Sequence, residues 1–242
     1  MSKPPRLFVE DDLGAHETIA LSPEHAHYLL TVLRRETGDA VLVFNGRDGE
    51  WRGALRRTGK RAAEIDLADK TRDQMPPPDV HYGFAPIKRA RLDFIAQKAT
   101  EMGASVLQPV VTRFTNAERV KTERLAANAI EAAEQCGVLW VPQVRAPITF
   151  QAFLDTHDTA RDLIFCDESA PVANPIEALR ALEPGPLTVL IGPEGGFSAE
   201  ERDLLLRLPK TVAISLGPRI MRADTAGIAA MALVQAVLGD WR

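Results

Sequence analysis

The stretch Leu187-Thr-Val-Leu-Ile-Gly-Pro-Glu-Gly-Gly-Phe-Ser-Ala-Glu-Glu201 decides the fold of the larger part of this chain. A short, mostly apolar run enters a turn with three glycines and one proline in five positions. Ser198 and Glu201 then form the capping-box pattern that starts a helix. A buried strand that turns directly into a helix is the unit of a parallel α/β sheet. The same alternation predicts strands at 80–84, 106–111, 163–166, 187–191 and 212–216, and helices at 90–102, 121–135, 176–182, 198–208 and 225–238.

The N-terminal part of the chain has a different pattern, and the segment 73–79 separates the two. This segment contains three consecutive prolines, which neither a helix nor a sheet accommodates. Strand-like runs precede it at 40–44, 51–55 and 62–67, with Asn-Gly, Asp-Gly and Thr-Gly turns between them. One helix is expected to begin at Ser22-Pro23 and to stop at Gly38. We therefore expect a small β-rich domain at 1–73 and an α/β domain at 74–242.

The composition excludes several classes of protein. The chain has 242 residues, of which 45% are hydrophobic and 26% are charged, with two cysteines. These values are ordinary for a folded domain, so a disordered chain is excluded. Two cysteines cannot form a disulfide framework or a four-cysteine zinc site, and no spacing of histidines suggests a metal. The start of the chain lacks a signal-peptide pattern, and the apolar run at 226–238 is too short to span a bilayer. We expect a cytoplasmic protein with no metal and no membrane contact.

Basic residues gather in two stretches of an otherwise acidic chain. Residues 34–61 and residues 80–125 each hold eight Lys or Arg and four Asp or Glu, whereas the formal net charge of the chain is −4. This distribution favours a polyanion whose phosphates are bound on one face. The alternative interpretation is that these side chains are merely solvated.

Two loops carry the chemistry, because ligands of α/β sheets bind outside the carboxyl ends of the strands. The glycine turn at 192–196 matches neither the dinucleotide-binding nor the P-loop pattern, and Glu194 would repel a polyphosphate. It favours a ligand without phosphates that carries positive charge, although a turn without a ligand is the alternative. The second loop, Leu216-Gly-Pro-Arg-Ile-Met-Arg-Ala-Asp-Thr225, places two arginines beside the crevice, which suits an anionic substrate. Asp224 is expected to cap the following helix.

With their spacing, these two loops resemble those of the SPOUT superfamily of methyltransferases. Within it, the chain is similar to the family that methylates N3 of a uridine in small-subunit (16S) ribosomal RNA. Further matching motifs are Lys98-Ala-Thr-Glu-Met-Gly103, Glu131-Ala-Ala-Glu-Gln-Cys-Gly137 and His27-Tyr-Leu-Leu-Thr-Val-Leu-Arg34. The chain departs from the family pattern at Asp224, where the family commonly has Glu, and at Val138, where it commonly has Arg.

The resemblance implies a mostly parallel C-terminal methyltransferase domain with a trefoil knot, an S-adenosylmethionine site and a PUA-like N-terminal domain that binds RNA. It also implies a homodimer whose partner is small-subunit ribosomal RNA or the 30S subunit. Two alternatives remain open. One is a related knotted methyltransferase that acts on transfer RNA or on a ribose 2′-hydroxyl, and the other is a catalytically silent RNA-binding assembly factor.

The resemblance, together with the chemistry of the acceptor, suggests candidate site residues. Uracil N3 carries a proton, so transfer requires a base or a cation that stabilises the anion. Asp224 is the expected base, Arg222 the stabilising cation, and Glu101 an alternative base. The expected cofactor-binding residues are Phe165, Cys166, Asp167, Ile191, Gly192, Pro193, Glu194, Gly195, Leu216, Gly217, Ile220, Met221, Arg222 and Thr225. The expected RNA-binding residues are Arg6, His27, Arg34, Arg35, Lys88, Arg89, Arg91, Arg113 and Arg219.

Overall fold

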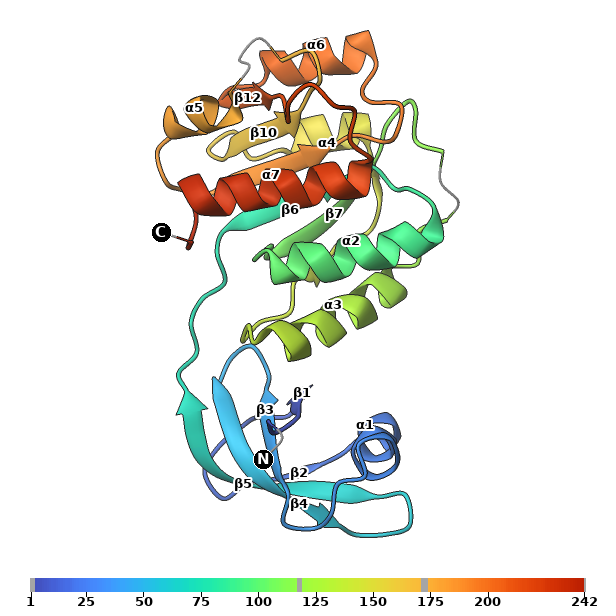
Figure 1. Ribbon diagram of the computed structural model, residues 1–242, viewed down its shortest axis with the longest axis vertical. Helices are drawn as coiled ribbons and strands as arrows, with labels where there is room; N and C mark the ends of the chain where they lie inside the picture. The colour runs from blue at the N-terminus through green and yellow to red at the C-terminus, as the bar shows by residue number, and fades with distance from the viewer. Residues whose placement is uncertain (1–2, 117–118, 171–173, 242) are drawn as a thin grey trace. The chain divides into compact units, whose positions relative to one another are not determined.

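The computed structural model describes residues 3–116, 119–170 and 174–241 (Figure 1). The chain divides into two compact units. The first comprises Met1–Pro76 together with Ala133–Val141, and the second comprises Pro77–Ala132 together with Pro142–Arg242.

The first unit is built on a five-stranded sheet in the order β1-β3-β4-β5-β2. The strands are β1 (Arg6–Phe8), β2 (Thr18–Ala20), β3 (Ala40–Phe44), β4 (Glu50–Arg57) and β5 (Ala63–Arg72). All neighbouring pairs are antiparallel except β1 and β3, which are parallel. The three strands predicted from the turn dipeptides are confirmed. The short strands β1 and β2 were not predicted, because three residues are too few to show a period.

The predicted helix of this unit begins as expected but ends early. Ser22 Oγ accepts a hydrogen bond from the N–H of His25 at 3.1 Å, and Pro23 is the first helical residue. The helix α1 (Pro23–His27) continues as a π-helical turn (Tyr28–Val32) and stops there. The prediction that it runs to Gly38 is wrong, because Arg34 adopts a left-handed conformation with φ 53°, which a right-handed helix cannot include.

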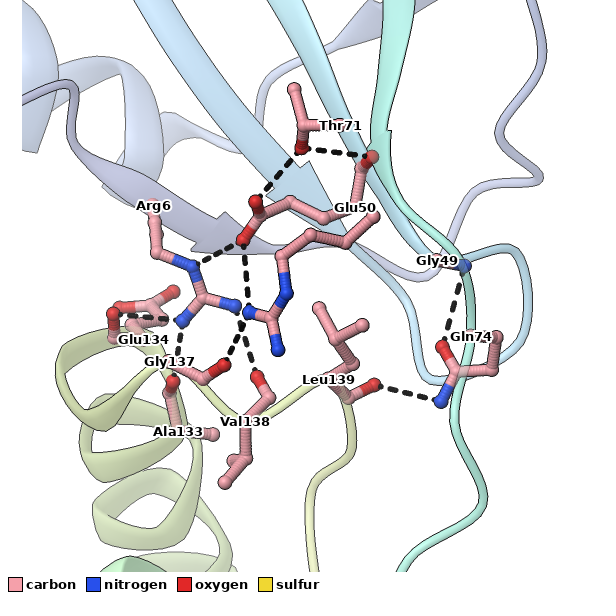
Figure 2. A network of polar contacts seen from close by, with 11 residues as sticks. Arg6, Gly49, Glu50, Thr71, Gln74, Ala133, Glu134, Gly137, Val138 and Leu139 are labelled. Carbon is pink, nitrogen blue, oxygen red and sulfur yellow. Dashed lines mark hydrogen bonds and ion pairs between the residues drawn. The ribbon is translucent and has the colours of Figure 1, made fainter.

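The C-terminal end of helix α3 (Thr122–Cys136) belongs to the first unit, where Arg6 of β1 caps it (Figure 2). The Arg6 guanidinium donates to the carbonyl oxygens of Ala133, Glu134 and Val138 at 2.7, 3.1 and 2.9 Å. Its Nε donates to Glu50 Oε2 at 2.7 Å. The last carbonyls of a helix have no partner within the helix, and this buried guanidinium satisfies them.

The second unit contains a seven-stranded sheet in which every strand pair is parallel. Its order is β12-β10-β11-β6-β7-β8, and β9 pairs with β7. The strands are β6 (Val80–Phe84), β7 (Val106–Val111), β8 (Gln143–Val144), β9 (Ile148–Thr149), β10 (Asp162–Cys166), β11 (Leu187–Ile191) and β12 (Thr211–Ile214). The predicted α/β fold with a mostly parallel sheet is confirmed. The trefoil knot stays a prediction.

The remaining helices are α2 (Arg89–Glu101), α4 (Phe150–Thr156), α5 (Pro175–Arg180), α6 (Ala199–Arg207) and α7 (Ala223–Val237). Helices α2 and α7 pack side by side, on the face of the sheet turned to the viewer in Figure 1. Helix α4 and the two-residue strands β8 and β9 were not predicted. None of the helices described is long and apolar enough to cross a membrane.

Candidate functional site

The carboxyl ends of β10, β11 and β12 meet at one edge of the sheet, because the three strands are parallel and adjacent. Phe165 of β10 pairs with Leu190 of β11, and Cys166 pairs with Ile214 of β12. The loops at 192–197 and 215–222 therefore leave the sheet on either side of β10. This is the arrangement in which α/β sheets bind ligands.

The first loop, at 192–197, is held in a fixed shape. A Cβ at Gly192 would lie 3.1 Å from the ring of Phe197, and Gly196 has a positive φ of 69°. Ser198 and Glu201 form the predicted capping box, in which each side chain accepts the other residue's backbone N–H, at 3.2 and 3.0 Å. The second carboxylate oxygen of Glu201 accepts the backbone N–H of Arg113 at 2.8 Å. The glycine turn is thereby connected to the segment that follows β7.

The second loop ends at the start of α7, and its side chains are largely exposed. Gly217 has a φ of 99°, and Ile220 exposes 90% of its surface, which is unusual for a large apolar residue. The prediction that Asp224 caps α7 is wrong. The N-cap position is Arg222, whose backbone is extended, whereas Asp224 is already helical and accepts the N–H of Thr225 at 2.9 Å.

A cation from a third strand end connects the two loops. Arg91, in the first turn of α2 after β6, places Nη1 at 3.4 Å from Asp224 Oδ2 and at 3.8 Å from Glu194 Oε1. These distances are those of ion pairs rather than short hydrogen bonds. Arg91 was predicted to contact RNA, but the structure places it between the two loops.

The comparisons with known proteins agree with this geometry. A family model described as an RNA methyltransferase domain matches residues 74–235, and one described as an RNA methyltransferase PUA domain matches residues 21–68. The ribosomal RNA small subunit methyltransferase E of Rickettsia conorii is 32% identical over 95% of this chain and 94% of its own length. The chain belongs to this RNA methyltransferase family.

Solved structures also resemble this chain over nearly its whole length, and two of them hold a cofactor. The ribosomal RNA small subunit methyltransferase E of Neisseria gonorrhoeae, bound to S-adenosyl methionine, is 26% identical with a TM-score of 0.82, over 99% of this chain and 100% of that chain. A methyltransferase from Legionella pneumophila, in complex with the same cofactor, is 26% identical with a TM-score of 0.84, over 97% and 98% of the two chains. The predicted PUA-like domain and the predicted family are confirmed.

The end of β10 offers mainly backbone to a ligand in this RNA methyltransferase. The Phe165 side chain is fully buried and packs edge-on against Phe197. Burial raises the pKa of the Cys166 thiol to about 12, so this thiol is neutral at ordinary pH. The Asp167 carboxylate accepts Arg202 Nε at 2.6 Å and the N–H of Ser169 at 2.9 Å. The Phe165 and Asp167 side chains are thus already engaged within the protein.

Glu101 is not brought to the site. Its carboxylate accepts both bonds from Lys98 Nζ, at 2.7 and 2.8 Å. It lies ten residues after Arg91, about 15 Å further along α2. The next residue, Met102, accepts a hydrogen bond from Gln235 near the far end of α7, whereas Asp224 lies at the beginning of α7. The structure therefore does not support Glu101 as the alternative base.

The predicted RNA-binding residues other than Arg91 differ in exposure. His27, Arg34, Lys88, Arg113 and Arg219 are exposed, so their side chains are accessible to RNA. Arg35 is half-buried and lies 4.0 Å from Asp39, and the side chain of Arg89 lies outside the described part. The prediction for Arg6 is wrong, because its guanidinium is buried and donates to Glu50 and to the end of α3.

Sequence reasoning missed Tyr82, which lies under the start of α7. Tyr82 is buried, and a Cβ at Gly227 would collide with its hydroxyl. Burial, with Cys166 and Asp224 nearby, raises the pKa of this hydroxyl above its ordinary range, so it stays neutral. The glycine within an otherwise alanine-rich helical run was the available signal, since it marks a close approach.

The sequence did not show that Glu201 connects the start of α6 to the segment after β7. The capping-box pattern already accounted for a glutamate at this position. Among the residues that the structure describes, no three His, Cys, Asp or Glu side chains gather as metal ligands.

Proposed function

We propose that this protein transfers the methyl group of S-adenosylmethionine to N3 of a uridine in 16S ribosomal RNA of the small subunit. The observation that carries the proposal is the ion pairing of Arg91 with both Glu194 and Asp224, which brings an acidic turn for the cofactor and an acidic side chain for the acceptor to one edge of the sheet. It is further supported by relatives named ribosomal RNA small subunit methyltransferase E.

The residues of the two loops fit this cofactor. A Cβ at Gly196 or at Gly217 would meet no atom within 4 Å, so space is open over both turns. Within the described part of the chain, the backbone N–H groups of Glu194, Gly195 and Met221 make no hydrogen bond and can donate to a ligand. When bound, the cofactor supplies an electrophilic methyl group on a positively charged sulfonium. Glu194 brings negative charge to the turn, which suits that cation and not a phosphate.

The cofactor would be held mainly by backbone groups. We assign this role to Ile191, Gly192, Pro193, Glu194, Gly195, Leu216, Gly217, Ile220, Met221, Arg222 and Thr225, with the chain at Phe165, Cys166 and Asp167 as a third wall. The exposed side chain of Ile220 is available to cover an adenine ring, since burying such a side chain is favourable.

Asp224 accepts the proton of uracil N3 in this proposal. Its position in the first turn of α7 is one where the helix dipole favours negative charge. Arg91 holds Oδ2 from one side, and the backbone N–H of Thr225 holds Oδ1, so the carboxylate is oriented before the substrate arrives. Arg222, directly before α7, supplies the cation that stabilises charge on the uracil as the proton leaves.

We further propose that residues 1–73 act as the RNA-binding module and residues 74–242 as the catalytic domain of a cytoplasmic homodimer. Sedimentation of the purified protein tests the dimer, which is expected at twice the chain mass of 26.5 kDa.

Comparison of a strain with and without this gene tests the function. Digested small-subunit RNA from the deletion strain should lack one methyluridine that the parent strain contains. Loss of a methyl group from transfer RNA or from a ribose would favour the related knotted methyltransferases. If the RNA modifications are unchanged, the protein is the silent assembly factor.

A further inference from the structure

Phe114 is a large aromatic side chain held out in a turn. It exposes 47% of its surface in the segment that follows β7, at the same carboxyl edge of the sheet as the two loops. A single exposed aromatic residue needs no explanation by itself. Phe114, however, lies in a hydrogen-bonded turn, next to the proposed cofactor loop and among basic side chains.

The turn that carries Phe114 is rigid. The N–H of Thr112 donates to Thr115 Oγ1 at 2.9 Å, and the N–H of Thr115 donates to the carbonyl of Thr112 at 3.1 Å. The N–H of Arg113 donates to Glu201, which is buried and caps α6. The ring is therefore presented by a preorganised backbone, so a ligand that covers it loses little conformational entropy.

The turn touches the proposed cofactor loop. A Cβ at Gly195 would lie 3.3 Å from Phe114 Cβ, so the backbone of Gly195 lies close to the Phe114 side chain. The neighbouring Glu194 pairs with Arg91, which also pairs with Asp224. Phe114 and the proposed catalytic carboxylate therefore flank the same loop.

Basic residues and a cavity adjoin the ring. Arg113 exposes 64% of its side chain, with Glu200 at 3.8 Å, and Arg119 and Lys121 are also exposed. A cavity of about 550 Å³ shares Thr115 with the turn and is lined by Val111, Arg119, Val120, Thr122 and Pro147 among others. Apolar walls with two hydroxyls and one guanidinium suit a nucleoside with a phosphate.

We propose that the turn Thr112–Thr115 and this cavity bind single-stranded RNA beside the target uridine. A flanking base stacks on Phe114, and Arg113 and Arg119 contact the phosphates, as in other proteins that combine aromatic platforms with basic grooves. The inference rests on the proposed function. The exposed arginines beside the ring favour RNA phosphates as the occupant. A second copy of the chain is the other candidate occupant, and the self-association of the variants tests it.

The test compares Phe114→Leu with Phe114→Trp, and uses Leu206→Ala on the exposed face of α6 as the matched control. The first variant keeps an apolar side chain but loses the ring, whereas the second keeps an aromatic face. The probe is a ten-nucleotide single-stranded RNA of mixed sequence containing uridine, measured by fluorescence anisotropy without cofactor. Stacking of one base predicts about tenfold weaker binding for Phe114→Leu and nearly unchanged binding for Phe114→Trp and Leu206→Ala.

Two further measurements separate the outcomes. Affinity for S-adenosylmethionine should be equal in all variants, and Arg119→Ala should reduce the slope of log K against log salt by about 0.7. The proposal is overturned if Phe114→Leu binds the RNA as the unaltered protein does, if the unaltered protein does not bind it, or if the variant loses self-association instead. Failure of the proposed function would look different, because RNA binding would depend on Phe114 while no small-subunit RNA is methylated.

Discussion

Arg91 Nη1 lies 3.4 Å from Asp224 Oδ2, and through this contact the helix after β6 holds the helix that follows β12. The same nitrogen reaches Glu194 in the loop after β11. Segments that follow three different strands thus contact one guanidinium. In the proposed function this cation fixes the position of the cofactor turn relative to the Asp224 carboxylate, which accepts the proton.

Removing this cation should loosen both loops. Arg91→Ala is expected to weaken S-adenosylmethionine binding about tenfold, because a partly buried ion pair loses its cation while two carboxylates stay close together. Arg91→Lys should retain part of the affinity for S-adenosylmethionine, since the lysine ammonium keeps the positive charge beside the two carboxylates. Calorimetry measures the change. Weakened RNA binding with unchanged cofactor affinity would instead support the original prediction that Arg91 contacts RNA.

The buried ion pair of the first unit should dominate its stability. Arg6→Ala removes the nearest cation from the buried Glu50 carboxylate, to which Thr71 and Arg72 still reach, and removes a donor from the carbonyls of Ala133, Glu134 and Val138. The variant is expected to cost roughly 3 kcal/mol in free energy of unfolding. Denaturant titration measures the loss. The exposed pair Arg47 with Asp12 is a matched control, and Arg47→Ala should cost less than about 1 kcal/mol. Equal effects of the two variants would contradict this account.

Substitution of Gly227 is expected to destabilise the protein because of the Tyr82 hydroxyl oxygen. Its Cβ would collide with the Tyr82 hydroxyl, so Gly227→Ala should destabilise the protein by about 1–3 kcal/mol despite the higher helix propensity of alanine. In the Tyr82→Phe background the same substitution should cost less, because the colliding oxygen is gone. A double-mutant cycle by thermal unfolding measures the difference. Additive effects would show that the hydroxyl is not the cause.

The two cysteines should differ in reactivity. The thiolate is the reactive form, and burial raises the pKa of Cys166 to about 12, so at pH 8 this thiol is almost wholly protonated. Cys136 is exposed. Brief treatment of the native protein with iodoacetamide at pH 8, read by mass spectrometry, should therefore modify Cys136 and spare Cys166. Cys166 is itself half-buried, and equal labelling of the two thiols would contradict its raised pKa.

Asp224 is the residue whose loss should separate binding from turnover. Asp224→Asn keeps the shape of the side chain but cannot take a proton, and should lower kcat by about 100-fold or more with cofactor affinity preserved. Asp224→Glu should remain active, since the carboxylate is retained. Methylation near the unaltered rate by Asp224→Asn would remove this residue from the mechanism.

The α/β pattern was predictable where strands and helices were long enough to show a period. The runs at 80–84, 106–111 and 187–191 were found with their full bounds. Residues 150–156 follow no turn signal other than Thr149, so helix α4 was missed although Thr149 caps it. Likewise, no local pattern indicates that Ala133–Val141 pack with the first unit, because that packing depends on Arg6 and Phe44, far away in the sequence.

The site was predictable as two loops but not as a set of contacts. The residue types pointed to Arg6 and Arg91 as surface cations, since most arginines are exposed. Each instead pairs with carboxylates from distant segments, and sequence spacing cannot show such pairs. Asp224 lies two residues after the true N-cap, an offset within the usual uncertainty of helix ends.

Transfer of an isotopically labelled methyl group in vitro tests the central claim most directly. Purified protein, labelled S-adenosylmethionine and small ribosomal subunits that lack the modification are incubated, and the digested RNA is mapped by mass spectrometry. The account predicts one labelled 3-methyluridine, formed by the unaltered protein and not by Asp224→Asn. Label on a ribose, on another base or on transfer RNA alone would contradict it.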